Sequence, residues 1–158
     1  MVKRPALCIV GLGYVGLPLA YAFAKNGFVV SGYDKSEKRI SELKEARDHT
    51  NELSQKELQS IRIEYETDPS VIGLADIIIM ALPTPVDEGN KPDLTMVEDA
   101  THTVGQHMKK GAIIVYESTV YPGVTEEICG KILAEESGMT CGEDFKLGYS
   151  PERINPGD

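Results

Sequence analysis

The chain has 158 residues, of which 41% are hydrophobic and 26% charged, and its formal net charge is −9. Length and composition are those of one globular domain that can bury a full hydrophobic core. The acidic balance argues against nucleic acid or an anionic membrane as a partner, because no basic cluster in the sequence offsets it. A phosphate group would have to be bound locally, by backbone N–H groups and a few basic side chains.

The first predicted element is a strand over residues 6–10, followed at once by Gly11, Gly13 and Gly16 in G-x-G-x-x-G spacing. In a dinucleotide-binding turn the first glycine permits the tight turn and the second lets the backbone approach the pyrophosphate. The third lets the next helix pack close to the strand, with its first N–H groups aimed at the phosphates. Glycine-rich turns are common, so the motif becomes specific only with its flanking strand and a later acidic residue.

The same region also has features of a secretory signal peptide. Lys3 and Arg4 precede a stretch without charged residues, residues 5–24. The glycine spacing argues against this interpretation, and the helical spacing of apolar residues continues to Asn26 and Gly27, which are typical of a helix end. We therefore expect a strand, a turn and a helix in a cytoplasmic protein, with neither a signal peptide nor a membrane span.

Asp34 ends a second predicted strand, residues 28–33, and lies 18 residues beyond Gly16. A carboxylate at this place can accept hydrogen bonds from the adenine ribose hydroxyls and would repel the 2′-phosphate of NADP. The alternative is that Asp34 caps the next helix. We favour the ribose contact, and therefore NAD as the cofactor.

Helix and strand signals alternate along the rest of the chain. Helices are predicted from about Ser36, at Ser54 with a capping box, from Asp68-Pro69, from Thr95 with a second capping box, and from a Thr125 cap; strands are predicted over residues 62–65, 77–82, 112–116 and 145–149. This alternation predicts the α/β class, with a doubly wound parallel six-stranded sheet (Rossmann fold) in the order 3-2-1-4-5-6. We expect residues 1–158 to be one domain cut from a longer protein.

Cysteine and histidine are the residues that most often bind metals, and the chain has Cys8, Cys129, Cys141, His49, His102 and His107. Their spacing matches no zinc motif, and an odd number of cysteines leaves one unpaired in any disulfide scheme. We expect no metal site, and buried structural thiols at Cys8 and Cys129.

Polar turns follow the fourth, fifth and sixth predicted strands, where a parallel sheet of this kind binds its ligand. These turns are residues 82–85 with Thr84, residues 117–123 with two hydroxyls and a carboxylate, and residues 149–157. Any one of them could be ordinary loop chemistry, because proline restricts a loop and Ser or Thr satisfies its N–H groups. Three such turns at one sheet edge favour a binding site.

The chain resembles the N-terminal domain of the UDP-glucose/GDP-mannose dehydrogenase family. The matching stretches are GLGYVGLPLA at residues 11–20, PTP at 83–85, ESTV at 117–120 with Pro122-Gly123, and SPE at 150–152. The resemblance implies enzymes that oxidise the C6 alcohol of a nucleotide sugar to a carboxylate and reduce two NAD in succession.

The resemblance also implies where NAD would bind. The backbone N–H groups of Tyr14 and Val15 would hold the pyrophosphate, and Asp34 the adenosine ribose. Arg39 matches a basic residue of the family that approaches that ribose or the phosphates.

On the nicotinamide side, the resemblance implies Thr84 and Ser118, with Pro83 in the same turn. Thr119 and Glu152 match residues that orient the catalytic water and manage protons around the sugar C6.

The residues after Glu152 sort the subfamilies. UDP-glucose enzymes resemble a pattern with a second Glu four residues later, where this chain has Pro156. The stretch looks more like the UDP-N-acetylhexosamine (GalNAc/GlcNAc) 6-dehydrogenases, with N-acetylmannosamine enzymes next. A UDP-glucose or GDP-mannose enzyme, or a non-catalytic NAD-binding module, is the alternative.

The family's nucleophilic cysteine, its partner lysine, its central helix and its UDP-sugar domain have no counterpart before residue 158. A thiol nucleophile is needed for the second oxidation. The resemblance thus implies that this chain alone binds NAD without turnover, and that the full-length protein is a homodimer acting on a UDP-sugar.

Overall fold

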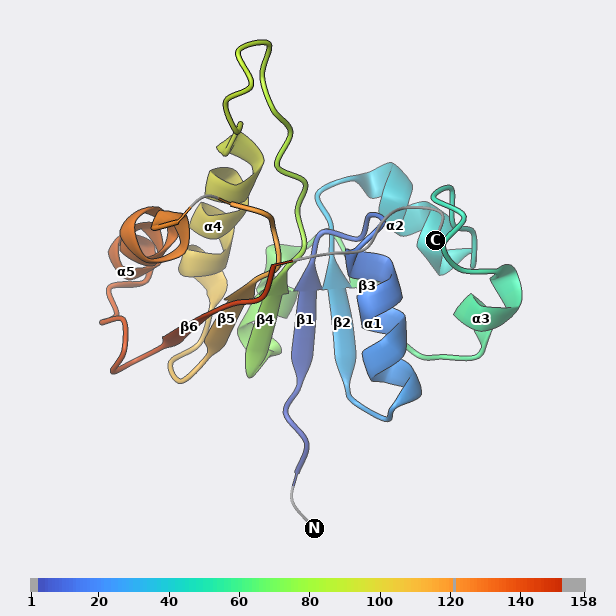
Figure 1. Ribbon diagram of the computed structural model, residues 1–158. Coiled ribbons are helices and arrows are strands. Elements are labelled where there is room, and N and C mark those ends of the chain that lie inside the picture. Colours follow the sequence, from blue (N-terminus) through green and yellow to red (C-terminus); the bar gives the residue numbers. More distant parts are fainter. Residues whose placement is uncertain (1–2, 121, 152–158) are drawn as a thin grey trace.

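The structure, a computed structural model, describes residues 3–120 and 122–151 and is built around a six-stranded parallel sheet (Figure 1). The strands are β1 (Leu7–Val10), β2 (Val30–Tyr33), β3 (Glu64–Glu66), β4 (Ile77–Met80), β5 (Ile113–Tyr116) and β6 (Lys146–Tyr149). Their order in the sheet is β3-β2-β1-β4-β5-β6, which confirms the predicted order. From β1 the chain adds β2 and β3 on one side of the sheet, and it then returns to add β4, β5 and β6 on the other side. The strand order thus switches between the parallel neighbours β1 and β4, and sheets of this kind bind ligands at the carboxyl ends of the strands beside this switch point.

Helices cover both faces of the sheet. They are α1 (Gly16–Lys25), α2 (Glu37–Lys44), α3 (Gln55–Gln59), the 3₁₀ helix η1 (Pro69–Leu74), α4 (Thr95–His107), the π-helix η2 (Val124–Cys129) and α5 (Gly130–Ser137). The segment between β4 and α4 rises above the sheet as an exposed hairpin, closed by a bridge between Val86 and Pro92 (Figure 1).

Strand β1 separates two hydrophobic cores, and all four of its residues are buried. Successive side chains of a strand point to opposite faces. Leu7 and Ile9 pack with residues of α1, α2 and α3, whereas Cys8 and Val10 pack with residues of η1, α4 and α5. Burial on both faces explains why this strand is a continuous apolar run.

Local sequence signals set several helix starts as predicted. The Ser36 hydroxyl accepts a hydrogen bond from the Arg39 backbone N–H and caps α2. The Ser54 and Glu57 side chains form the predicted capping box of α3. Asp68 caps η1, which has Pro69 as its first residue.

Two predicted helix caps are wrong. Thr95 is the first residue of α4 and does not cap it; the Asp93 carboxylate, two residues earlier, accepts the Thr95 N–H instead. Thr125 is a buried residue inside η2, which begins after Gly123 in a left-handed conformation and has no side-chain cap. In both cases a neighbouring residue ends the preceding loop before the predicted threonine cap: Asp93 does so before α4, and Gly123 before η2.

The cysteine prediction is confirmed at two positions. Cys8 and Cys129 are buried free thiols, and burial raises the pKa of both, to about 11 for Cys8. Neither is therefore a thiolate at neutral pH. Cys141 is exposed in the turn before β6, at the amino-terminal edge of the sheet.

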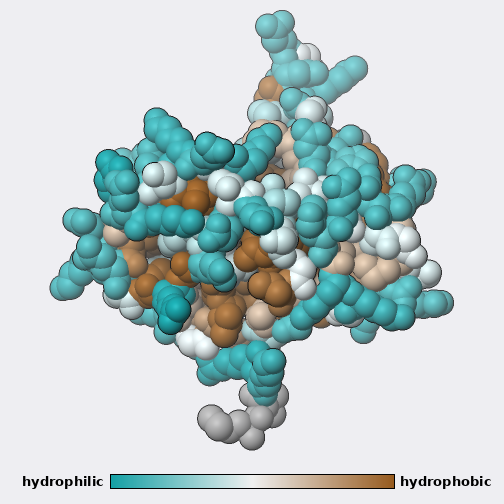
Figure 2. Space-filling view, turned by 180° about the vertical axis from the view of Figure 1, so that it is seen from behind, coloured by the Kyte–Doolittle hydropathy of each residue, from teal (hydrophilic) through white to brown (hydrophobic). Residues whose placement is uncertain are grey.

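The face of the molecule that Figure 2 shows is mostly hydrophilic, and its hydrophobic residues gather around the centre and lower left of the view. Within residues 3–120 and 122–151, no helix is long and apolar enough to cross a bilayer.

Candidate functional site

A cleft of about 410 Å³ lies at the carboxyl-terminal edge of the sheet, next to β1, β2, β4 and β5. It is lined by the turn after β1, the end of β2, the loops after β4 and β5, and one side of α4. Its size is ordinary for a cofactor or small-molecule site. The predicted site residues that line it are Gly11, Gly13, Tyr14, Val15, Asp34, Pro83, Thr84, Ser118 and Thr119.

The glycine turn is shaped by two glycines that no other residue can replace without a shift of backbone. Gly11 has φ +91°, and a Cβ there would lie 2.6 Å from the Ala81 carbonyl oxygen. A Cβ on Gly16 would lie 1.8 Å from the Gly11 carbonyl oxygen. The roles predicted for the first and third glycines, a tight turn and close helix packing, thus have a direct steric cause.

Gly13 differs from both. A Cβ at Gly13 would meet no protein atom within 4 Å, and its backbone is not in the left-handed region. Gly13 lines the cleft, so the absence of a side chain leaves space for a ligand, whereas no neighbouring protein atom needs that space.

Replacing Gly13 by alanine is therefore expected to leave the free energy of unfolding within about 0.5 kcal/mol of the wild-type value. NAD affinity should fall by about tenfold or more, because the methyl group fills the space that the backbone offers to the pyrophosphate. Chemical denaturation and calorimetric titration measure the two quantities. A variant that binds NAD as tightly as the wild type would contradict this role.

The start of α1 is suited to a phosphate group. Val15 precedes the helix without a side-chain cap, and the first turn has no acidic residue. The first N–H groups of a helix lack intrahelical acceptors and carry the positive end of its dipole. A negatively charged group is thus favoured here although the chain as a whole is acidic.

Asp34 lies in the cleft with its carboxylate fixed at two points. Its Oδ2 accepts the Leu12 N–H at 3.0 Å and its Oδ1 accepts the Ser36 N–H at 2.9 Å. Ser36, and not Asp34, is the cap of α2. Each carboxylate oxygen can accept a second hydrogen bond, so the ribose contact predicted for Asp34 is compatible with both backbone contacts.

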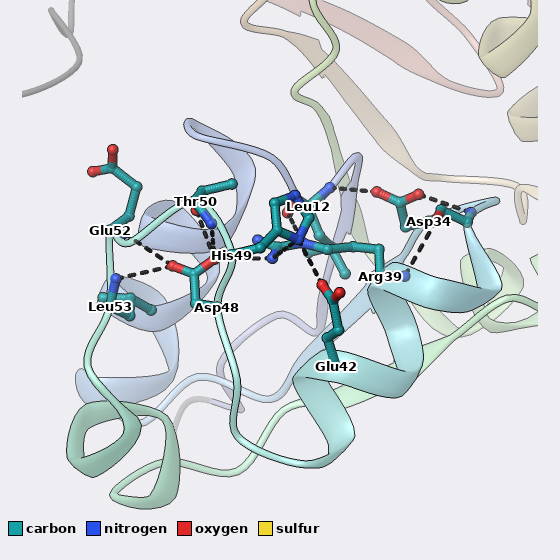
Figure 3. A network of polar contacts seen from close by, with 10 residues as sticks. Leu12, Asp34, Arg39, Glu42, Asp48, His49, Thr50, Glu52 and Leu53 are labelled. Atoms are coloured by element: carbon teal, nitrogen blue, oxygen red, sulfur yellow. Dashed lines mark hydrogen bonds and ion pairs between the residues drawn. The ribbon is translucent and has the colours of Figure 1, made fainter.

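Arg39 lies underneath the glycine turn (Figure 3). Its side chain is buried and is absent from the residues that line the cleft. The guanidinium Nε donates to the Leu12 carbonyl oxygen at 2.7 Å, and Nη1 donates to Asp48 at 2.9 Å. The direct contact with ribose or phosphate implied for Arg39 remains a prediction; the observed contact is with the backbone of the turn.

The hydroxyls expected on the nicotinamide side join the loops after β4 and β5. Ser118 Oγ donates to the Leu82 carbonyl oxygen and Thr84 Oγ1 donates to the Thr119 carbonyl oxygen, each at 2.7 Å. Both hydroxyls can still accept a hydrogen bond from a ligand. Glu117 lines the cleft beside them, and Glu152 lies outside the described residues.

Sequence reasoning missed two parts of this region. One side of the cleft is formed by α4, through Met96, Asp99, Ala100 and Thr103. The second part that was missed is Asp48, whose buried side chain lies below the glycine turn. The apolar spacing of α4 pointed only to its core face, whereas a Ser/Thr/Asp-rich loop signal at residues 48–50 was available for Asp48.

The sheet order, the glycine turn at a helix N-terminus and the acid after β2 define a dinucleotide-binding domain of the Rossmann type. Comparison with known proteins gives the family. Residues 5–158 match the model of the "UDP-glucose/GDP-mannose dehydrogenase family, NAD binding domain". The chain therefore belongs to this family and forms its NAD-binding domain.

Individual relatives are similar over nearly the whole chain. It is 52% identical to Protein CapL of Staphylococcus aureus and 50% identical to a UDP-N-acetyl-D-glucosamine 6-dehydrogenase of Salmonella typhi. Each match covers 96% of this chain and 36% of the relative. The solved structure of UDP-D-ManNAc dehydrogenase from Pyrococcus horikoshii is similar with a TM-score of 0.89 at 32% identity, covering 96% of this chain and 37% of that one. The chain thus spans little more than a third of these relatives.

Proposed function

We propose that this chain is the NAD-binding part of a UDP-N-acetylhexosamine 6-dehydrogenase, which oxidises the C6 alcohol of the sugar to a carboxylate. The observation that carries the proposal is the 50% identity, over 96% of the chain, with a UDP-N-acetyl-D-glucosamine 6-dehydrogenase. The cleft supports it, because its glycine turn, helix N-terminus and Asp34 fit a dinucleotide with an unmodified ribose.

The bound NAD would supply the hydride acceptor for the oxidation. The turn backbone at Tyr14 and Val15 would hold its pyrophosphate, and Asp34 its adenine ribose. The joined loops carrying Thr84 and Ser118 would form the nicotinamide side and keep their backbones fixed through the two hydroxyl contacts.

Protons are released at each oxidation, so the reacting sugar needs a nearby acceptor and a held water molecule. Thr119, exposed at the cleft, and Glu152 are our candidates for these roles. The second oxidation also needs a thiol nucleophile. Cys8 and Cys129 are buried and Cys141 lies at the opposite sheet edge, so we expect this thiol, and the UDP-binding residues, from the part of the protein that follows this domain in its relatives.

We further propose that the complete protein acts in the cytoplasm, where its nucleotide-sugar substrate would be available, and that it is a homodimer. Gel filtration with light scattering tests the second statement on the complete protein.

The substrate is tested with the full-length protein, NAD and a panel of nucleotide sugars, with NADH absorbance as the readout. UDP-N-acetylglucosamine or UDP-N-acetylgalactosamine should be oxidised fastest. Preference for UDP-glucose or GDP-mannose would replace the proposed substrate by the sister reaction. NAD binding without turnover of any sugar would instead indicate a non-catalytic NAD-binding module.

A further inference from the structure

We propose that Asp48 is a positioning residue of the NAD site, which acts through Arg39 on the carbonyl group of Leu12 and thereby holds the glycine turn in its binding conformation. The proposal rests on the proposed binding of NAD at this turn. It assigns a role in cofactor binding to the loop between α2 and α3, which contributes no residue to the lining of the cleft. Figure 3 shows Arg39 between Asp48 in this loop and Leu12 in the glycine turn.

The Asp48 carboxylate is the centre of a dense set of hydrogen bonds, and its side chain is fully buried. Oδ1 accepts from Arg39 Nη1 at 2.9 Å and from the N–H and hydroxyl of Thr50 at 3.0 and 2.6 Å. Oδ2 accepts the N–H groups of Glu52 and Leu53, both at 3.0 Å. Burial acts to raise the pKa of Asp48, but these hydrogen bonds outweigh it and the pKa lies below its ordinary value, so the group stays charged.

Arg39 transmits this anchoring to the turn. Only 5% of the residue is exposed, and a buried guanidinium is costly unless it is paired. Asp48 neutralises it at Nη1 while Nε holds the Leu12 carbonyl oxygen at 2.7 Å. Because the guanidinium is a rigid plane, fixing one edge on Asp48 fixes the position of the other.

Leu12 is the residue between the first two glycines, and both of its backbone groups are held. Its carbonyl oxygen accepts from Arg39 and its N–H donates to Asp34 Oδ2 at 3.0 Å. The N–H groups expected to meet the pyrophosphate, those of Tyr14 and Val15, follow Leu12 in the same turn. A glycine-flanked residue is conformationally free in the unfolded chain, so these two contacts account for the order of the turn.

A purely local role for Asp48 makes a different prediction. Contacts with Thr50, Glu52 and Leu53 all lie within its own loop, and a residue that only ordered this loop would leave the glycine turn unchanged. The contact through Arg39 is what separates the two possibilities, since it spans from residue 48 to residue 12.

The test compares Asp48→Asn and Arg39→Lys with the wild type in the full-length protein. Lysine keeps a charge beside Asp48 but cannot hold both Asp48 and the Leu12 carbonyl through one planar group. In NAD-free protein, amide hydrogen exchange of residues 10–16 should be faster in both variants. Calorimetry should give an NAD dissociation constant raised by about tenfold or more in both variants. Because both substitutions break the same chain of contacts, the double variant should bind NAD no more weakly than the single variant with the lower affinity.

Asp144→Asn is the matched control. Asp144 accepts from Lys110 Nζ at 2.8 Å and from the Thr140 N–H at 3.0 Å, but it precedes β6 at the amino-terminal edge of the sheet. Its substitution should change neither exchange of the turn nor NAD affinity.

The outcomes separate this inference from the proposed function. If the wild type binds no NAD, the proposed function fails. If the wild type binds NAD and both variants bind it equally well, or exchange rises only in residues 45–54, the positioning role is wrong. If Asp48→Asn does not fold, Arg39→Lys decides alone: normal turn exchange and NAD affinity in that variant would overturn the proposal.

Discussion

Replacing Gly16 by alanine is expected to lower the free energy of unfolding by at least about 3 kcal/mol. The new Cβ would lie 1.8 Å from the Gly11 carbonyl oxygen and 2.9 Å from its carbonyl carbon, so backbone must move to admit it. Gly16 is also the first residue of α1, where helix propensity alone would favour alanine by about 1 kcal/mol. Steric overlap and propensity thus predict opposite signs, and the overlap should dominate.

Urea denaturation of wild type, Gly16→Ala and Gly13→Ala measures this effect with a control from the same turn. Gly13→Ala should unfold like the wild type, because a Cβ there has no protein neighbour within 4 Å. Equal stability of Gly16→Ala and the wild type would show that α1 does not pack against the turn as described.

Replacing Asp34 by alanine is expected to weaken NAD binding by about 100-fold and to remove most of the preference for NAD over NADP. Hydrogen bonds to a charged group contribute about 1.5–3 kcal/mol each, and the variant loses the carboxylate that would accept from the ribose hydroxyls. It also frees the Leu12 N–H, which donates to Asp34 at 3.0 Å, and so loosens the turn. NADP should lose little, because the repulsion of its 2′-phosphate disappears with the charge.

Calorimetric titration with NAD and with NADP measures both parts of this prediction. Asp68→Ala is a suitable control, since the Asp68 carboxylate also accepts a backbone N–H two residues later but is not one of the residues that line the cleft. An Asp34→Ala variant with unchanged NAD affinity would show that the ribose contact is assigned to the wrong residue.

The fold could be predicted because its signals are local and repeat along the chain. The buried strand at residues 77–80, the capping box at Ser54 and the glycine spacing after β1 each have one structural interpretation in an alternating α/β pattern. The caps predicted at Thr95 and Thr125 are wrong, because a threonine followed by Glu three residues later, or by acidic residues, competes with neighbouring Asp93 and Gly123. Such competition depends on loop conformation, which the pattern does not contain.

For the site, the sequence indicated which turns meet but not what their side chains contact. The hydroxyls of Thr84 and Ser118 each donate to a carbonyl oxygen of the neighbouring loop, a partner more than 30 residues distant. Arg39 is buried below the turn because Asp48 pairs with it there, and no periodic pattern links these two positions. Contacts between loops of different strands therefore had to come from the structure.

We propose a two-step oxidation of a UDP-N-acetylhexosamine for the protein that contains this domain. Converting an alcohol to a carboxylate takes two hydride transfers, so each sugar consumed should yield about two NADH. The most direct measurement supplies the full-length protein with excess NAD and a limiting, known amount of the nucleotide sugar, and follows NADH absorbance to completion. A yield of about two supports the claim. A yield of about one, or no NADH with any nucleotide sugar, would contradict it.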